Sequence, residues 1–596
     1  MKKTRQTKQP RIYYVKWIAG IYGEHKPYVL LLLFLTIFTT VVTTLYPLVY
    51  KYIIDQLTVN LTLFEEGRLS IEQALAERNT IIIILLIFGV AMVLTNIYPY
   101  MRGRLNLLFE ISLRRKFFEK IMNKSYRFFQ KYRTGDIATR LTEDLSTHPP
   151  GISWFLCSGI FRALNSSCII IFCLVSMFIL NPLLTVLSII PIPLMLLVFF
   201  KLETIVEEKF SLFRKSASKT NDFLESAYSG IKILKSFNAE PHQKKHFARQ
   251  LEKRKIIEID VMAIQGMFGI YFEFLNYLGQ VFVLLFGGIM VIRGDVTLGT
   301  YIAFYAYLGM IVWPLLDIPQ FFVTGTQACV TIDRLDEISL FEPDYKDVEE
   351  DKASFEAFSS LAVENLSFAF DKDKDQGFAL ENISFAVNKG ERVAIVGKIG
   401  SGKTTLLNLL TGIYQPQSGH IRLNKKDLAD YNKDSYRKKL GYIEQLPLVL
   451  SENVYTNIDF WRELGDARIS MGAKTSQFMD EIEHLPYGFE TTLGQRGVGL
   501  SGGQKQRLSI ARALSGEPKL LIMDDVTSAL DAENEKQLWH ELFEANTDLT
   551  SIIVTHRMSS AKTADRIIVL NEGRIEAEGT HEELLKTSPT YRELIK

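Results

Sequence analysis

The chain has 596 residues, of which 47% are hydrophobic and 23% are charged, and its formal net charge is +1. Hydrophobic cores rarely grow beyond about 250–300 residues, so this length predicts more than one domain. A nucleic-acid-binding protein usually concentrates positive charge on one face, so the near-neutral balance argues against a nucleic-acid partner. The four cysteines lie within or beside apolar segments and match neither a zinc site nor a disulfide framework.

The first 26 residues are basic, and Glu24 is their single acidic residue. They show neither the short apolar core nor the small-residue cleavage site of a signal peptide. Basic segments next to membrane spans tend to stay on the cytoplasmic side. We therefore expect residues 1–26 to form a basic cytoplasmic tail.

Apolar stretches dominate the first half of the chain. A membrane-crossing helix needs roughly 20 mostly apolar residues. Six stretches qualify, over residues 27–49, 79–100, 153–180, 182–200, 266–292 and 297–323. The basic segment 102–148 is expected to face the cytoplasm, and the more acidic loop between the first two stretches is expected outside. The sequence thus predicts a six-helix transmembrane domain over 27–325, embedded in membrane lipid, with both termini in the cytoplasm.

Two inner segments, 101–152 and 201–265, are too long for simple turns and too polar for the membrane. Their apolar residues recur at helical spacing, as in Leu113, Phe117 and Ile121. Helices of this length rise 1.5 Å per residue and would extend tens of Å below the bilayer. They are either solvated hairpins or levers that reach a cytoplasmic motor domain.

A nucleotide-binding motif opens the second half. Arg392–Val396 is a short β-like run, and the GxxxxGK[ST] pattern of a phosphate-binding loop follows it. Its glycines let backbone amides close around phosphate oxygens, and the next helix points its positive end at them. Lys403 is expected to reach the β- and γ-phosphates of ATP. The predicted cofactor-binding residues of this loop are Gly397, Lys398, Ile399, Gly400, Ser401, Gly402, Lys403, Thr404 and Thr405.

An acidic residue ends a buried strand further along the chain. Leu520–Met523 is a continuous apolar run, and Asp524 follows it. Such a strand can deliver a carboxylate to the Mg²⁺ that accompanies ATP. Thr404 and Asp524 are therefore predicted metal ligands. The pattern is weak by itself, but together with the phosphate-binding loop it predicts an α/β P-loop domain.

Leu500–Gln504 reads Leu-Ser-Gly-Gly-Gln, the signature of the ATP-binding-cassette (ABC) superfamily, and here the chain resembles that superfamily. The glycines again allow phosphate to approach a helix N-terminus closely. The resemblance implies that Ser501, Gly502, Gly503 and Gln504 cap an ATP held by the loop of a second nucleotide-binding domain. One such domain alone does not complete a site.

Further elements of the family follow in the expected order. Gln445 matches the glutamine that senses Mg²⁺, and His556 matches the switch histidine that contacts the γ-phosphate. Ser528–Asp531 matches the D-loop, which communicates between two sites. Phe370 matches the aromatic residue that stacks on adenine, although the family more often has tyrosine there. The resemblance therefore adds Gln445 to the metal ligands and His556 and Gln445 to the catalytic residues.

Asp525 stands where the family places a catalytic glutamate that polarises the attacking water. Aspartate lacks one methylene, so its carboxylate falls about 1 Å short, and a misplacement of that size can cost on the order of a hundredfold in rate. The resemblance thus implies a slow catalytic site and favours a heterodimer with a different half-transporter over a homodimer. The retained His556 keeps a slow homodimer as the alternative.

The first half also resembles exporters of this superfamily, with coupling segments near 125–140 and 225–240. After the transmembrane domain we expect a linker over 326–358 and then the nucleotide-binding domain over 359–596. The resemblance implies ATP-driven export by a multi-pass protein of a bacterial cytoplasmic membrane, with the nucleotide-binding domain in the cytoplasm. An ATP-gated channel or a cargo sensor built on the same fold is the alternative.

The sequence indicates the chemical nature of the cargo only indirectly. Arg162, Glu273 and Asp317 are the charged residues within spans, and each lies near the inner membrane edge. One interpretation is that these side chains form a local ion pair or extend to the membrane interface. The other is that they form the charged rim of an inward-facing cavity. The last two spans carry several aromatic residues, and an uncharged aromatic interior suits a small amphipathic cargo such as a drug, lipid or peptide-like compound.

Overall fold

The computed structural model describes residues 10–595 apart from 68–70, 149–150, 342–351, 371–378, 495–498, 528–531 and 545–547. The chain divides into two compact units. The first comprises Met1–Met122 and Arg133–Leu340, and the second comprises Asn123–Tyr132 and Phe341–Lys596. A ten-residue piece of the first half of the chain therefore belongs to the C-terminal unit.

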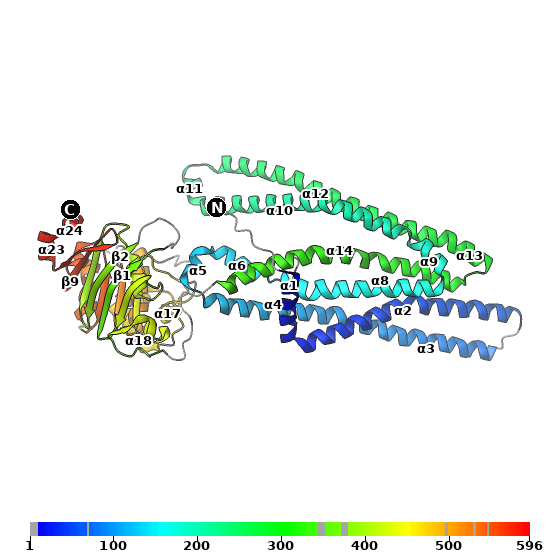
Figure 1. The fold of residues 1–596 in the computed structure, drawn as a ribbon, viewed down its shortest axis with the longest axis horizontal. Helices are drawn as coiled ribbons and strands as arrows, with labels where there is room; N and C mark the ends of the chain where they lie inside the picture. Colours follow the sequence, from blue (N-terminus) through cyan, green and yellow to red (C-terminus); the bar gives the residue numbers. More distant parts are fainter. Residues whose placement is uncertain are drawn as a thin grey trace. The chain divides into compact units, whose positions relative to one another are not determined.

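The first unit is helical in all of its described regular structure (Figure 1). Its α-helices are α1 (Arg11–Glu24), α2 (Lys26–Glu65), α3 (Ile71–Thr95), α4 (Ile97–Met122), α6 (Thr134–Thr142), α7 (Ile152–Trp154), α8 (Ile160–Leu180), α9 (Pro182–Ile189), α10 (Pro191–Ser229), α11 (Ile231–Ser236), α12 (Glu240–Phe282), α13 (Gly288–Arg293) and α14 (Leu298–Leu340). Two π-helical turns, η1 (Phe155–Gly159) and η2 (Val283–Gly287), lie within long helices. The inner segment expected over 201–265 forms a hairpin of α10 and α12, with α11 at its tip.

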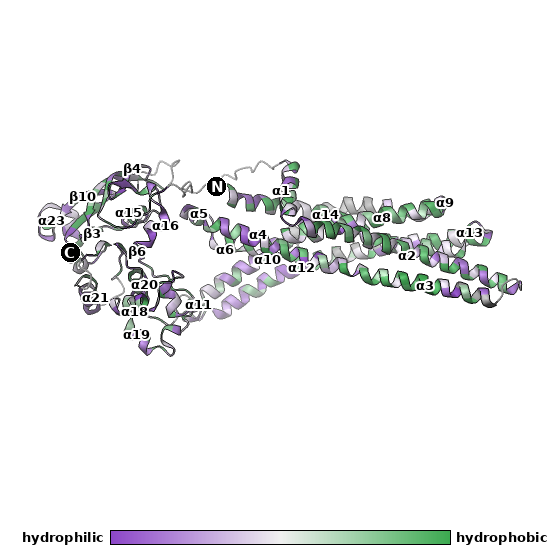
Figure 2. Ribbon diagram, turned by 90° about the horizontal axis from the view of Figure 1, so that it is seen from below, coloured by the Kyte–Doolittle hydropathy of each residue, from purple (hydrophilic) through white to green (hydrophobic). Residues whose placement is uncertain are grey.

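Five helical stretches are long and apolar enough to cross a membrane within the part of the chain that the structure describes. They are Lys26–Glu65, Arg78–Met122, Ile152–Leu180, Glu240–Arg293 and Leu298–Leu340. The expected fourth span, 182–200, coincides with α9 and the start of α10, where most side chains after 191 lie outside the described part. Figure 2 shows hydrophobic residues along the membrane stretches and hydrophilic ones where α10 and α12 approach α11.

The membrane unit is held together by buried contacts among α2, α8, α12 and α14. Phe304 and Tyr307 of α14 are fully buried, and the Tyr307 hydroxyl donates to the carbonyl of Thr44 at 3.0 Å. Further along α2, the Asp55 carboxylate accepts a hydrogen bond from the Gly299 amide at 2.9 Å, which satisfies one free donor of the α14 N-terminus. Helix α14 continues to Leu340, so a linker starts later than the expected 326.

The second unit is an α/β domain with two sheets. Its strands are β1 (Ser360–Phe368), β2 (Leu380–Asn388), β3 (Arg392–Gly397), β4 (Ser418–Leu423), β5 (Lys426–Asp427), β6 (Leu440–Ile443), β7 (Leu520–Asp524), β8 (Thr550–Val554), β9 (Arg566–Asn571) and β10 (Arg574–Gly579). One sheet has the order β2-β1-β4-β5 and is antiparallel. The other has the order β10-β9-β3-β8-β7-β6 and is parallel except for β10.

The second unit also contains α-helices. They are α5 (Tyr126–Lys131), α15 (Lys403–Leu410), α16 (Lys433–Lys438), α17 (Val454–Asp459), α18 (Asp466–Thr475), α19 (Met479–His484), α20 (Gly502–Ser515), α21 (Ala532–Glu544), α22 (Met558–Ala561), α23 (His581–Thr587) and α24 (Pro589–Ile595). All five residues of β7 are buried, as expected of a parallel strand covered on both faces. Its Asp524 lies in register with Val554 of β8, so these strands end at the same edge of the sheet. Ligands of open α/β sheets bind at that edge.

Candidate functional site

The phosphate-binding loop joins β3 to α15. Gly400 and Gly402 have φ angles of +83° and +99°, a region that side chains other than glycine rarely adopt. A Cβ added at Gly397 would lie 2.1 Å from the carbonyl oxygen of Leu570, whereas one at Gly400 would meet nothing within 4 Å. The loop therefore needs glycine for its own shape and leaves open space at its tip. That geometry fits a loop that wraps a polyphosphate.

Lys403 is the first residue of α15 and is buried inside the loop. Its Nζ donates hydrogen bonds to the carbonyl oxygens of Gly397 and Lys398, both at 2.8 Å. Burial lowers the pKa of Lys403, and the nearby carboxylates of Asp524 and Asp525 partly oppose that shift. An ammonium held in this way gains from an incoming phosphate, because the anion replaces lost solvation.

Thr404 and Asp524 come together at the end of β7. The Thr404 hydroxyl donates to Oδ2 of Asp524 at 2.8 Å. Burial raises the pKa of Asp524, and the neighbouring Asp525 adds to that rise. A hydroxyl and a carboxylate are hard oxygen ligands of the kind that Mg²⁺ prefers. The pair therefore has the ligand chemistry that a magnesium ion beside the loop would need.

Asp525 follows immediately, with a φ of +45°. Its amide donates to the carbonyl of Val554 at 2.8 Å, which fixes it against the end of β8. Its carboxylate oxygens lie 3.5 Å from Nε2 of Gln445 and 3.5 Å from the amide nitrogen of His556. The three residues predicted to be catalytic thus meet at one place, although both contacts are at the long limit for a hydrogen bond.

The signature Leu500–Gln504 forms the start of α20. The Ser501 hydroxyl accepts from the Gln504 amide at 3.2 Å, and the Gln504 side chain accepts from the Ser501 amide at 2.8 Å. This capping box leaves Ser501 and Gly502 exposed. Within the described part of the chain, no hydrogen bond joins these residues to the phosphate-binding loop. The predicted D-loop, Ser528–Asp531, lies outside the described residues.

An aromatic cluster lies between the expected adenine site and α5. Phe370 is exposed, and its ring meets the rings of Phe368 and Tyr414 edge-on at 5.3 and 5.9 Å. From the other side, Nε2 of Gln130 donates to the Tyr414 hydroxyl at 2.6 Å. The guanidinium of Arg127 lies 5.6 Å from the Phe368 ring centroid. The first predicted coupling segment therefore contacts the residues that support Phe370.

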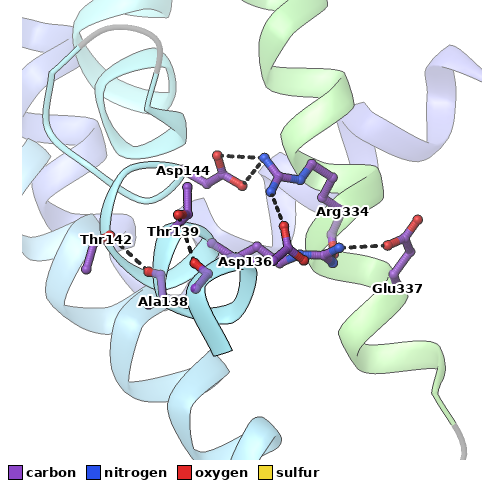
Figure 3. A network of polar contacts seen from close by, with 9 residues as sticks. Asp136, Ala138, Thr139, Thr142, Asp144, Arg334 and Glu337 are labelled. Carbon is purple, nitrogen blue, oxygen red and sulfur yellow. Dashed lines mark hydrogen bonds and ion pairs between the residues drawn. The ribbon is translucent and has the colours of Figure 1, made fainter. Parts of the chain in front are cut away.

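The next part of that segment belongs to the membrane unit and forms a charged network with α14 (Figure 3). Arg334 bridges two acidic residues, with Nη2 3.0 Å from Asp136 and Nη1 2.8 Å from Asp144. Arg140 is buried and lies 2.9 Å from Asp136 and 3.1 Å from Glu337. Burial raises the pKa of Asp144, and Arg334 opposes that rise. Asp136 and Arg140 lie in the predicted coupling segment 125–140, but the sequence did not predict their partners on α14.

The charged residues within the spans are partly paired. Nε of Arg162 lies 2.8 Å from Asp317, and the Ser166 hydroxyl donates to the same carboxylate at 2.6 Å. The structure therefore favours a local ion pair for Arg162 and Asp317, while Glu273 is exposed. Of the aromatic residues on the last two spans, Tyr305 and Trp313 are exposed and Phe304 is buried.

Comparison with known proteins agrees with this layout. A family described as ABC transporter transmembrane region matches residues 29–315, and one described as ABC transporter matches residues 380–528. The uncharacterized ABC transporter ATP-binding protein YknU of Bacillus subtilis is 31% identical, covering 85% of this chain and 86% of its own length. The ATP-dependent lipid A-core flippase of Syntrophus aciditrophicus is 30% identical, covering 81% of this chain and 79% of its own length. The solved structure of a bacterial Atm1-family ABC exporter with ATP bound shares the fold, with a TM-score of 0.78 over 96% of this chain and 98% of that chain, at 23% identity.

A helical membrane domain followed by an α/β domain with this loop and signature defines an ATP-binding-cassette membrane protein. The chain belongs to the ABC transporter family and is a half-transporter of the exporter type, which confirms the resemblance drawn from Leu500–Gln504. It is a multi-pass membrane protein with an ATP-binding domain.

Proposed function

We propose that this chain hydrolyses ATP to export a small amphipathic compound across the bacterial cytoplasmic membrane. The observation that carries the proposal is the meeting of Lys403, the Thr404–Asp524 pair and Asp525 at one edge of a sheet. These groups lie in the same chain as five apolar helices long enough to span a bilayer, counted over the described residues. Nucleotide chemistry and a membrane path are thus encoded together.

Each residue of the nucleotide site has its own role in the proposed ATP hydrolysis. Lys403 balances charge on the β- and γ-phosphates, and the loop amides orient them. Thr404, Asp524 and Gln445 would hold a Mg²⁺, which would supply positive charge beside the phosphates when bound. Asp525 orients the attacking water and accepts its proton, and His556 contacts the γ-phosphate. Phe370 stacks on the adenine ring.

We further propose that two half-transporters act as a dimer. The signature residues Ser501–Gln504 of one nucleotide-binding domain then cap the ATP bound by the other. A different partner chain is favoured because Asp525 makes this site slow, and a homodimer would carry the short side chain twice. A partner with a glutamate at this position would supply the faster site.

The amphipathic cargo is supported by the apolar and aromatic residues of the last two spans and by the names of relatives. One similar protein is described as an ATP-dependent lipid A-core flippase, and another, YheI of Bacillus subtilis, as a probable multidrug resistance ABC transporter. The first name refers to a lipid and the second to drugs. The same preference is proposed here for the exported compound.

Transport by sealed vesicles tests the proposal against the channel and sensor alternatives. The purified protein, with any partner that co-purifies, is reconstituted so that the nucleotide-binding domains face outward. Addition of ATP and Mg²⁺ should drive a fluorescent amphipathic dye into the lumen against its gradient, while ADP should not. Flux only down the gradient would favour a channel, and ATP-dependent dye binding without accumulation would favour a sensor.

A further inference from the structure

Glu535 of α21 is a buried carboxylate that no motif of the sequence singles out. Only 4% of its side chain is exposed. One carboxylate oxygen lies 2.9 Å from Nη1 of Arg557, and the other accepts from the hydroxyls of Ser559, at 2.9 Å, and Ser560. These donors outweigh the effect of burial and lower the pKa of Glu535. The carboxylate is therefore charged, and all of these partners come from one short segment after β8.

Ser560 also connects this cluster to the chain segment that follows Asp525. The Ser560 hydroxyl lies 3.0 Å from the hydroxyl of Thr527 and accepts from the indole nitrogen of Trp539 at 3.3 Å. Thr527 comes two residues after Asp525, and Arg557 comes directly after His556. The network therefore restrains the two chain segments that follow Asp525 and His556. Glu535 is the charged group at its centre.

Stability alone does not explain a charge in this place. Burying an ion pair costs desolvation, and replacing such a pair by apolar side chains is often neutral or stabilising. What a buried, fully bonded carboxylate adds is a fixed geometry for its donors. Here the donors follow His556, whose amide nitrogen lies 3.5 Å from Asp525.

We propose that Glu535 is a positioning residue for ATP hydrolysis, which sets the distance between His556 and Asp525. The proposal rests on the ATPase activity proposed above. A shift of the Arg557–Ser560 segment moves His556 directly, while the contact through Ser560 and Thr527 restrains the segment after Asp525. Because Asp525 is one methylene shorter than glutamate, hydrolysis tolerates little further displacement.

The test uses the full-length protein in lipid. Glu535→Gln keeps the side-chain size but turns an amide toward Arg557, so kcat for ATP hydrolysis should fall about tenfold or more, with KM for ATP changed less than about twofold. Glu533→Gln is the matched control, because Glu533 lies on the same helix and is exposed. It should leave both constants unchanged. Arg557→Ala should reproduce the kcat loss, and it serves as the second variant if Glu535→Gln does not fold.

A double-mutant cycle with His556→Ala separates positioning from general stabilisation. If Glu535 acts through His556, the residual rate of His556→Ala should not fall further when Glu535→Gln is added. A tenfold additional loss, or a kcat loss matched by a rise in KM, would overturn the positioning role. Unchanged kcat in Glu535→Gln, with active wild-type protein, would overturn this proposal alone. Wild-type protein that hydrolyses no ATP would overturn the proposed function and this proposal together.

Discussion

Asp525 occupies a confined place at the end of β7. The residue is buried, its backbone is fixed by the bond to Val554, and its carboxylate only just reaches Gln445 and the amide of His556. Both of those distances are 3.5 Å, so a side chain longer by one methylene would approach its partners more closely. The geometry is thus consistent with a carboxylate that is too short for efficient hydrolysis.

We expect Asp525→Glu to raise kcat for ATP hydrolysis, by about tenfold or more, because the carboxylate then reaches the attacking water. Steady-state ATPase assays on the purified protein, alone and with any co-purifying half-transporter, measure the effect. Asp565→Glu is a suitable control, because Asp565 pairs with Arg392 outside the nucleotide site. Brisk hydrolysis by a pure homodimer, unchanged in Asp525→Glu, would refute both the slow site and the case for a different partner.

Lys403 allows a prediction with two readouts. Lys403→Met should abolish ATP hydrolysis and transport, because Lys403 is the buried cation of the loop, whereas Lys398 is exposed and pairs with Glu593. The pKa of Lys403 is lowered by burial, so at neutral pH the charged ammonium disfavours the folded state relative to an unburied lysine. The variant should therefore unfold at a temperature no lower than wild type in the absence of nucleotide. Calorimetry checks this, and normal turnover would contradict the assignment of the loop.

At the residue scale, local motifs were predictable and long-range pairs were not. The phosphate-binding loop, Asp524 and the signature are each specified by a few adjacent residues, so they can be found without the fold. Arg334, Glu337 and Glu535 are single charges on helices, and such charges usually face water. Their roles depend on partners 22 to 198 residues away, which only the folded chain brings within bonding distance.

At the scale of elements, the network of Figure 3 joins α6 to α14. Helix α6 follows directly after α5, which belongs to the nucleotide-binding unit, and α14 precedes the chain's return to that unit. Arg334 bonds to Asp136 and Asp144, so both elements have to move together within the membrane unit. We propose that this connection contributes to coupling between ATP hydrolysis and transport.

Arg334→Ala should therefore uncouple the protein. We expect basal ATP hydrolysis to remain within about twofold of wild type while ATP-driven transport falls about tenfold or more, since the nucleotide site is untouched. Arg254→Ala is the control, because Arg254 pairs with Glu258 one helical turn away on the same helix. Asp136→Asn should repeat the loss. Wild-type transport in both Arg334→Ala and Asp136→Asn would exclude a role for the network in coupling.

The long helices were predictable from runs of apolar residues, but their ends were not. Helix α2 continues to Glu65 and α14 to Leu340, well beyond the apolar runs that predicted them. Polar extensions of this kind are stabilised by helical continuity and tertiary contacts, which hydropathy does not report. The π-helical turns η1 and η2 were also missed, because one extra residue in a turn leaves no signal in an apolar stretch.

At the scale of the whole molecule, purification of the intact complex tests the identity of the proposed partner chain. In the proposed dimer, the signature of one chain completes the nucleotide site formed by the phosphate-binding loop of the other. We expect the tagged protein, purified from its native host in mild detergent, to carry a second half-transporter with a glutamate at the position of Asp525. Mass spectrometry identifies it. Purification of this chain alone, as an active dimer, would contradict the heterodimer.

The place of α5 in the nucleotide-binding unit constrains how the protein is made. Gln130 bonds to Tyr414, which lies 284 residues later along the chain. At about 5–20 residues per second, a ribosome needs roughly 15–60 s to make that stretch. A helix of six residues is not stable by itself, so α5 cannot complete its folding until the C-terminal domain arrives. Until then Phe128, fully buried in the finished protein, stays exposed. This early segment is therefore among the last to be folded, and a nascent chain interrupted before Tyr414 exposes an unfolded α5 to chaperones and proteases.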